Sequence, residues 1–246
     1  MTGTGRMPTH GMVLAAGLGL RMRPLTDNLP KPLIPVAGRC MLDRALDHLT
    51  VAGVTQRVVN THYLGTMVAD HLDARQQDEG VAATIAISHE PELLDTGGGV
   101  VKALPLLGAA PFFVINGDIL WRDGAEPALR RLGAAWADER MDGLLLVHPR
   151  ESAIGYDGPG DFHLAADGTL TRRSQASAPF VFTGVQILSP RLLDGAPAGA
   201  FSLNKLYDRA SAARRLHGIV HNGNWFHIGT PQGLRLAEER LRALIG

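Results

Sequence analysis

Short apolar segments alternate with amphipathic ones over the first 150 residues, and this alternation limits the possible folds more than any other feature of the chain. The apolar segments predict buried strands, at residues 11–16, 56–61, 83–88, 111–116 and 143–148. The amphipathic segments between them predict helices, at residues 42–53, 64–72, 100–107 and 126–138. Strands joined through helices form right-handed βαβ units. We therefore predict an α/β fold whose doubly wound, mainly parallel sheet carries helices on both faces.

The pattern changes after Pro149. Short segments separated by turn residues predict antiparallel strands, at 161–164, 170–173 and 180–188. We expect residues 149–190 to form an inserted substrate or lid region. The rest of the chain predicts two strands and a closing helix, at 215–221, 225–228 and 231–245. Residues 1–10 are expected to be a flexible N-terminus, and residues 11–246 a single domain.

The charge balance argues against two classes of partner. Lys and Arg together number 24, as do Asp and Glu, so the formal net charge is zero. Binding to nucleic acid or to an anionic membrane requires clustered positive charge, so we expect neither partner. No apolar run approaches the roughly 18–20 residues that span a bilayer. The lone cysteine, Cys40, excludes an internal disulfide and fits the reducing cytoplasm, where we expect the protein to be.

A glycine-containing loop, Ala15-Ala16-Gly17-Leu18-Gly19, follows the first expected strand directly. Glycines at these two positions let backbone N–H groups approach an anion closely. The spacing lacks the third glycine of a dinucleotide fingerprint and the GK[ST] ending of a P-loop. Two readings are open: a phosphate-binding loop, or a structural turn between strand and helix.

Two basic residues follow this loop. Arg21 lies two residues after Gly19, and Lys31 stands between two prolines, which favour an extended chain that holds its ammonium over the loop. We expect both side chains to be exposed in the open cleft. A guanidinium and an ammonium placed together would neutralise a triphosphate. The alternative is that both are solvated loop charges.

An acidic residue follows the strand expected at 111–116, where the sequence reads Asn116-Gly117-Asp118. The carboxyl end of such a strand borders the ligand crevice of an open α/β sheet. Asp118 is therefore a candidate Mg²⁺ ligand, because Mg²⁺ combines few protein carboxylates with phosphate oxygens and water. The alternative is an Asx-type turn in which Asp118 caps the next segment.

Residues 14–26 (LAAGLGLRMRPLT) and 30–33 (PKPL) together resemble the signature of the sugar-1-phosphate nucleotidylyltransferases, whose fold is a Rossmann-like α/β sheet. The resemblance covers nearly the whole chain, since it continues through 94–99, 112–118, 182–184 and 225–230. Within the family, three features are similar to the short bacterial N-acetylmuramate 1-phosphate uridylyltransferases of cell-wall recycling. These are the triple glycine and the segments 160–162 and 200–203.

The resemblance implies roles for particular residues. Arg21, Lys31 and Asp118 would act in catalysis, with Asp118 holding the metal. The nucleotide would be bound by Ala15, Ala16, Gly17, Gly19, Glu92, Thr96, Gly97 and Asn116. The sugar hydroxyls would be bound by Asp161, Thr183, Gly184 and Asn204, each of which is also an ordinary turn or cap residue, and the sugar phosphate by Lys205. A carboxylate at 92 accepts a hydrogen bond from the amino group of guanine or cytosine as easily as it serves uracil. The sequence therefore specifies the base weakly.

The sequence departs from the family at His227. The family places a second metal-binding aspartate in a Trp-x-Asp-x-Gly-Thr segment, where this chain has Trp225-Phe226-His227-Ile228-Gly229-Thr230. Neutral imidazole is a poor Mg²⁺ ligand but a fair one for Mn²⁺ or Co²⁺. His227 could bind such a metal, position a metal-bound water, contact phosphate, or pack without binding anything.

The function implied by the resemblance is nucleotidyl transfer from a nucleoside triphosphate, UTP first, to a sugar 1-phosphate, N-acetylmuramate 1-phosphate first. One alternative is the same chemistry on another pair, such as guanylyl transfer to mannose 1-phosphate or cytidylyl transfer to phosphocholine. Another is a regulatory protein that binds a nucleotide sugar with reduced turnover, against which the intact Arg21 and Lys31 argue. Either a monomer or a small homo-oligomer is compatible with the sequence.

Overall fold

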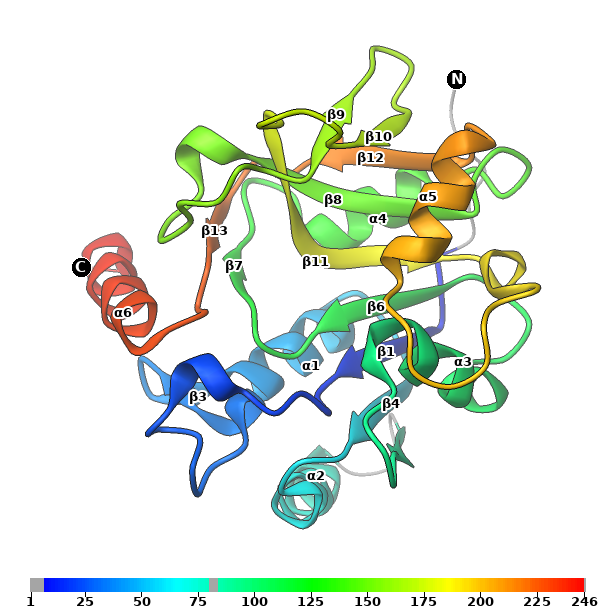
Figure 1. The fold of residues 1–246 in the computed structure, drawn as a ribbon. Helices are drawn as coiled ribbons and strands as arrows, with labels where there is room; N and C mark the ends of the chain where they lie inside the picture. The colour runs from blue at the N-terminus through cyan, green and yellow to red at the C-terminus, as the bar shows by residue number, and fades with distance from the viewer. Residues whose placement is uncertain (1–6, 80–83, 246) are drawn as a thin grey trace.

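The computed structural model describes residues 7–79 and 84–245, which contain a nine-stranded central sheet covered by helices (Figure 1). Four neighbouring strands are parallel, in the order β6-β1-β4-β5. Their bounds are β1 His10–Leu14, β4 Gln56–Thr61, β5 Thr84–His89 and β6 Phe112–Asn116. The chain passes from β1 to β4 and β5 on one side of β1, and then returns to its other side as β6.

Beyond β6 the sheet becomes antiparallel. The long strand β11 pairs with β6 on one side and with β8 on the other, β9 and β10 lie beside one end of β11, and β12 pairs with β8 in parallel. The bounds are β8 Gly143–Pro149, β9 Phe162–Leu164, β10 Leu170–Arg172, β11 Phe180–Leu188 and β12 Leu216–Val220. The antiparallel strands expected within 149–190 are present, and they join the central sheet directly.

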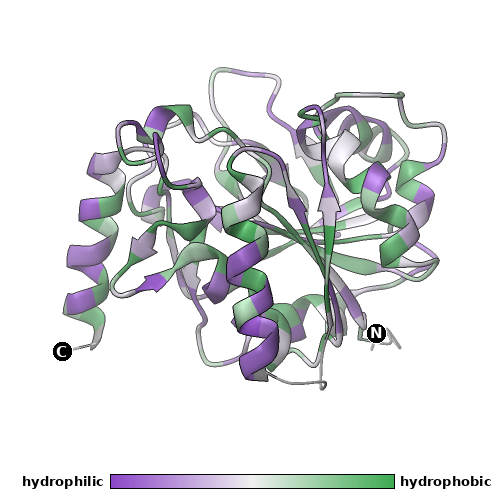
Figure 2. Ribbon diagram, turned by 90° about the horizontal axis from the view of Figure 1, so that it is seen from below, coloured by the Kyte–Doolittle hydropathy of each residue, from purple (hydrophilic) through white to green (hydrophobic). Residues whose placement is uncertain are grey.

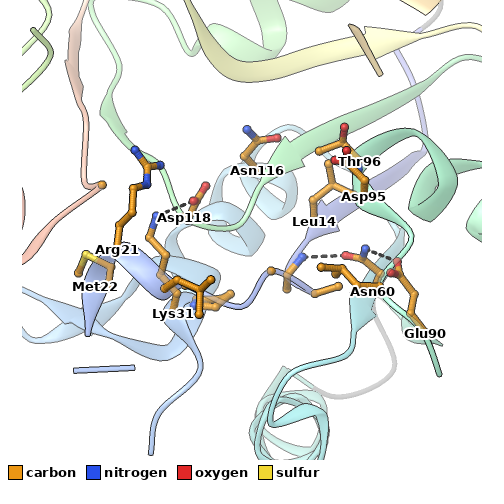
Figure 3. A pocket seen from close by; sticks show the side chains of 18 of the residues that line it. Leu14, Arg21, Met22, Lys31, Asn60, Glu90, Asp95, Thr96, Asn116 and Asp118 are labelled. Atoms are coloured by element: carbon orange, nitrogen blue, oxygen red, sulfur yellow. Dashed lines mark hydrogen bonds and ion pairs between the residues drawn. The ribbon is translucent and has the colours of Figure 1, made fainter. Parts of the chain in front are cut away.

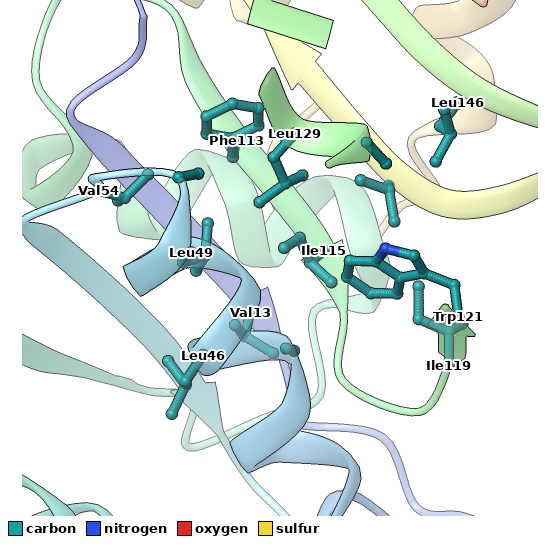
Figure 4. Close-up of a cluster of buried hydrophobic side chains, with 14 of the residues drawn as sticks. Val13, Leu46, Leu49, Val54, Phe113, Ile115, Ile119, Trp121, Leu129 and Leu146 are labelled. Carbon is teal, nitrogen blue, oxygen red and sulfur yellow. The ribbon is translucent and has the colours of Figure 1, made fainter. Parts of the chain in front are cut away.

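Helices cover both faces of the sheet because successive side chains of a strand point to opposite faces, and apolar side chains occur on both. In β1, Val13 faces the cluster under α1, α2 and α4, whereas Met12 faces the cluster under α3 and α5. The bounds are α1 Met41–Val51, α2 Gly65–Glu79, α3 Asp95–Leu107, α4 Ala128–Ala135 and α5 Asn204–Ala212. Figure 2 shows the apolar residues gathered on the sheet and on the inward faces of the helices. In Figure 4, Leu46 and Leu49 of α1 lie in the same cluster as Val13 and Ile115.

A third apolar cluster lies beside the central sheet. Phe226 and Ile228 contact Ala237 and Leu241 of the closing helix there, together with Met22 from the loop after β1. The elements around it are β2 Pro35–Val36, β3 Arg39–Cys40, β7 Leu120–Arg122, β13 Asn224–Phe226 and α6 Pro231–Ile245. β7 and β13 pair with each other, as do β2 and β3. The C-terminal segment is thereby fixed next to the loop after β1.

The predicted α/β, Rossmann-like, doubly wound fold is confirmed. The strands 56–61 and 180–188 and the helix 231–245 have the predicted bounds. Some predicted bounds were wrong: α3 begins at Asp95 rather than at residue 100, and α2 runs to Glu79 rather than to residue 72. The helix α5 at 204–212 was not predicted. Of the expected N-terminal segment, residues 1–6 lie outside the described residues, as does Ala83 of the strand expected at 83–88. None of the described helices is long and apolar enough to cross a membrane.

Candidate active site

A cavity of about 730 Å³ opens at the carboxyl ends of β1, β4 and β6 (Figure 3). The strand order reverses at β1, and such a reversal is where open α/β sheets bind ligands. Most of the predicted phosphate-binding and nucleotide-binding residues line this cavity: Ala15, Ala16, Gly17, Gly19, Arg21, Lys31, Thr96, Asn116 and Asp118. The structure therefore brings together residues that are up to about 100 positions apart in the sequence.

The two glycine positions of the loop differ in whether the backbone requires glycine there. Gly19 has a φ of 63°, in the left-handed region that favours glycine, and its carbonyl accepts a hydrogen bond from the Thr26 hydroxyl at 2.9 Å. Gly17 is exposed and is not in the left-handed region, and a Cβ built on it would meet no heavy atom within 4 Å. Nothing in the described fold requires glycine at 17, so the space beside it is open to a ligand.

We expect Gly17→Ala to raise KM for the triphosphate by about tenfold or more, the equivalent of about 1.4 kcal/mol of lost contact. The added methyl group would occupy the space in which a phosphate approaches the loop. The melting temperature should stay the same or rise slightly, because the site accepts a Cβ and alanine restricts the unfolded chain. Initial rates and thermal unfolding check both parts. An unchanged KM would show that the loop does not contact the triphosphate.

Arg21 and Lys31 reach the cavity from two single-turn 3₁₀ helices, Leu20–Met22 and Lys31–Leu33. Arg21 is exposed, as expected, and its guanidinium has no hydrogen bond or ion pair within the described part of the chain. Lys31 corrects two expectations. It begins a helical turn after an extended Pro30, and its side chain is buried, with its Nζ 2.6 Å from Oδ2 of Asp118.

Asp118 is turned toward the loop by the residue before it. The Gly117 N–H donates to the carbonyl of Leu14 at 2.8 Å, and a Cβ on Gly117 would collide with that same oxygen. The side chain of Asp118 is 40% exposed, and Lys31 is its hydrogen-bond partner among the described residues. The Asx-type cap is therefore not formed. A half-exposed carboxylate with a free oxygen at the cavity fits the donor set that Mg²⁺ prefers.

The sequence did not indicate a buried polar chain that supports the glycine loop. Asn60 accepts a hydrogen bond from the Ala15 N–H at 2.7 Å and donates to Oε1 of Glu90 at 2.7 Å, as Figure 3 shows. Oε2 of Glu90 accepts from the Leu94 N–H at 3.0 Å, one residue before α3. Asn60 is 3% exposed and Glu90 is fully buried. These hydrogen bonds join the loop after β1 to the start of α3. The available signal was a polar residue at the end of an apolar strand, as at Asn116.

We expect Asn60→Ala to raise KM for the triphosphate by about tenfold, because the loop loses the bond that fixes Ala15. The free energy of unfolding should also fall by about 1–3 kcal/mol, since the carboxylate of Glu90 is left buried with one partner fewer. Steady-state kinetics and urea unfolding measure the two effects. If the substitution lowered stability but left KM unchanged, Asn60 would have no role in presenting the loop.

The segment around the triple glycine differs from its predicted role. Glu92 is exposed and does not line the cavity; Glu90 does. Gly97 also lies outside the lining, and its N–H donates to the carbonyl of Phe201 at 2.8 Å. A Cβ on Gly97 would meet the Phe201 ring at 2.3 Å, and a Cβ on Gly99 would meet Glu90 at 2.7 Å. The glycines therefore allow α3 to pack closely, which explains their presence without a ligand.

The predicted sugar-binding residues separate into two pairs. Thr183 is fully buried and donates to the carbonyl of Leu146 at 2.8 Å, and Gly184 packs against Asn116. Neither lines the larger cavity or a smaller one described next. Asp161 and Asn204 line a smaller cavity of about 220 Å³. Its remaining lining residues are Phe162, Arg172, Arg173 and Phe182. Lys205 is exposed and lines neither cavity.

His227 lies at the edge of the larger cavity, outside its lining residues. Its ring stacks on Trp225 with centroids 6.1 Å apart, and its Nδ1 lies 3.2 Å from the carbonyl of Gly155. A Cβ on Gly229, which does line the cavity, would be 2.9 Å from Nε2 of His227 and 3.5 Å from Nη1 of Arg21. The imidazole and the Arg21 guanidinium thus border the same glycine.

One group of three side chains with metal-ligand chemistry lies elsewhere in the described residues. The ligand atoms of Cys40, Asp43 and His71 are within 4.8 Å of one another. Oδ1 of Asp43, however, already bonds to His71 and to Arg75, each at 2.9 Å. Burial raises the pKa of the Cys40 thiol to about 11, which keeps it protonated. We interpret this group as a tie between α1 and α2, outside the cavity.

Comparison with known proteins agrees with this geometry. The sequence pattern of the nucleotidyl transferase family matches residues 10–156. The chain is 44% identical over 236 residues to the N-acetylmuramate alpha-1-phosphate uridylyltransferase of Caulobacter vibrioides, covering 95% of this chain and 97% of that protein. It is 27% identical to the mannose-1-phosphate guanyltransferase of Schizosaccharomyces pombe, covering 90% of this chain and 61% of that protein.

The fold also matches a solved structure, that of UDP-glucose pyrophosphorylase complexed with UDP-glucose. The TM-score is 0.80 at 16% identity, over 97% of this chain and all of that one. At this level of identity the match concerns the fold alone. The family pattern and the identity to the Caulobacter protein extend the agreement to the sequence. The chain therefore belongs to the nucleotidyl transferase family and is an enzyme of the sugar-1-phosphate nucleotidylyltransferase type.

Proposed function

We propose that the protein transfers a uridylyl group from UTP to N-acetylmuramate α-1-phosphate and releases pyrophosphate. The observation that carries the proposal is the convergence of Arg21, Lys31 and Asp118 on one cavity beside the glycine loop. The choice of substrates rests on the similarity to the Caulobacter uridylyltransferase, which is greater and more complete than that to the guanyltransferase.

The chemistry needs charge neutralisation and positioning more than proton transfer. An oxygen of the sugar 1-phosphate attacks the α-phosphorus in line, and the bond to the pyrophosphate oxygen breaks. The attacking oxygen is already anionic near neutral pH, so a general base is not needed. The unpaired guanidinium of Arg21 binds the leaving phosphates. The ammonium of Lys31, held in place by Asp118, stabilises charge on the α-phosphate.

Mg²⁺ is the cation we expect at Asp118, with Mn²⁺ or Co²⁺ as alternatives, and when bound it would neutralise the phosphate oxygens. The family's second aspartate is replaced by His227, whose Nε2 borders the same glycine as the Arg21 guanidinium. A guanidinium repels a cation and attracts a phosphate. We therefore assign His227 to a phosphate oxygen and Asp118 alone to the metal.

Pyrophosphate release measured over four nucleoside triphosphates and several sugar 1-phosphates tests the proposal. We expect the highest rate with UTP and N-acetylmuramate 1-phosphate. If GTP or CTP turned over at least tenfold faster than UTP with every acceptor, guanylyl transfer to mannose 1-phosphate or cytidylyl transfer to phosphocholine would replace uridylyl transfer. If a nucleotide sugar bound tightly and no pair reacted, the protein would be a regulatory binder.

Two properties stay predictions from the sequence. A cytoplasmic location is checked by cell fractionation, and a monomeric or small homo-oligomeric state by light scattering after size-exclusion chromatography.

A further inference from the structure

At two places a residue that lines the larger cavity contacts a residue close in sequence to one that lines the smaller cavity. The Thr96 hydroxyl lines the larger cavity and accepts the Leu203 N–H at 3.0 Å, and the next residue, Asn204, lines the smaller one. At the second place, Asn116 of the larger cavity packs against Gly184, and Phe182, two residues earlier in β11, lines the smaller one. A substrate whose phosphate lies at Arg21 and Lys31 can thus extend into the smaller cavity.

One of the two arginines that line the smaller cavity, Arg173, has no acidic partner among the described residues. The cavity lining holds two arginines and one aspartate, and Oδ2 of that aspartate, Asp161, accepts the Phe182 N–H at 2.8 Å. Arg172 pairs with Asp208 at 2.8 Å. Arg173 donates from Nε to the carbonyl of Gly160 at 2.9 Å and from Nη1 to that of Gln175 at 3.1 Å. No carboxylate of the described residues forms an ion pair with Arg173.

A guanidinium held by carbonyl oxygens and lacking an acidic partner is arranged to bind an external anion. Its planar donors match the two oxygens of a carboxylate. The sugar that we propose as acceptor supplies such a group, because N-acetylmuramate is N-acetylglucosamine with a lactyl ether, and the lactyl ether ends in a carboxylate.

We propose that Arg173 binds the lactyl carboxylate of the acceptor, so that the smaller cavity selects a sugar acid over the neutral sugar. This inference rests on the proposed function. Arg172 lies in the same lining, but its charge is paired with Asp208, so the proposal assigns the carboxylate to Arg173.

The test compares two acceptors that differ in the lactyl group alone, N-acetylmuramate 1-phosphate and N-acetylglucosamine 1-phosphate, with UTP as donor. In Arg173→Gln we expect kcat/KM for the first acceptor to fall by about tenfold to a hundredfold, as for the loss of one charged hydrogen bond. The value for the second should change less than about twofold, which also shows that the variant is folded. Arg214→Gln is the matched control, because Arg214 is an exposed arginine that lines neither cavity.

The two proposals fail in different ways. If the wild-type protein did not prefer N-acetylmuramate 1-phosphate, the proposed function would be wrong, and the inference with it. If the wild type showed the preference and Arg173→Gln kept it, only the inference would be overturned. An equal loss with both acceptors would also overturn it, since Arg173 would then serve a group common to both, such as the phosphate. A selective loss that Arg214→Gln does not reproduce supports the inference.

Discussion

Arg21→Ala is expected to lower kcat/KM by about a hundredfold or more, the scale of losing one charged contact to the transition state. The guanidinium projects into the cavity and has no partner in the described structure, so its charge is free to bind the leaving phosphates. For the same reason its removal should leave the melting temperature unchanged. Initial rates with UTP and thermal unfolding measure the two quantities.

Arg23→Ala is the control for this substitution. Arg23 lies two residues away, is exposed, pairs with Asp27 four residues later and does not line the cavity. Its substitution should leave kcat/KM within about twofold of wild type, since exposed ion pairs contribute little. Comparable activity of Arg21→Ala and Arg23→Ala would remove Arg21 from the catalytic residues and leave it a solvated loop charge.

Lys31 shows how the structure changes what a variant measures. From the sequence alone it is a second exposed cation, and its replacement should affect catalysis without affecting folding. In the structure it is 7% exposed and paired with Asp118. Its removal would therefore lower stability as well as activity, because it leaves a carboxylate beside a vacated space. Arg21 is the cleaner test of the phosphate contacts.

The features that the sequence predicted are those encoded by neighbouring residues. Alternating apolar segments predicted the parallel strands and the helices on both faces. The glycine loop, Arg21 and Asp118 stand directly after strands or in the turns that follow, and parallel strands bring their carboxyl ends together whatever the details of packing. The cavity therefore contains most of the predicted phosphate-binding residues.

The features that the sequence missed depend on contacts between distant residues. The sequence pointed to Glu92, whereas Glu90 is the carboxylate that turns inward. Its partner there is Asn60, which lies 30 positions earlier. Gly97 was expected to bind the nucleotide, whereas α3 uses Gly97 and Gly99 to approach Phe201 and Glu90. The hydroxyl of Thr183 donates a hydrogen bond to the carbonyl of Leu146 on the neighbouring strand. No local pattern contains that information.

Asp118→Asn is expected to lower kcat/KM by about a hundredfold to a thousandfold. The substitution keeps the shape of the side chain but removes the carboxylate that pairs with Lys31 and lines the cavity. Lys31 also loses the partner that positions its ammonium. Direct binding of Mn²⁺ to the nucleotide-free protein, followed by electron paramagnetic resonance, should be lost, which separates the metal from the rest of the catalytic effect.

His227→Ala completes this experiment, because Asp118→Asn is expected to affect binding of the metal and His227→Ala binding of the phosphate. If Asp118 alone holds the cation, His227→Ala should bind Mn²⁺ as the wild type does and raise KM for UTP several-fold. If His227→Ala weakened Mn²⁺ binding as much as Asp118→Asn, the imidazole would be a metal ligand. The site would then favour Mn²⁺ or Co²⁺ over Mg²⁺, because imidazole nitrogen suits those cations better. The position of Nε2 beside the Arg21 guanidinium favours the first result, since a cation bound there would be repelled.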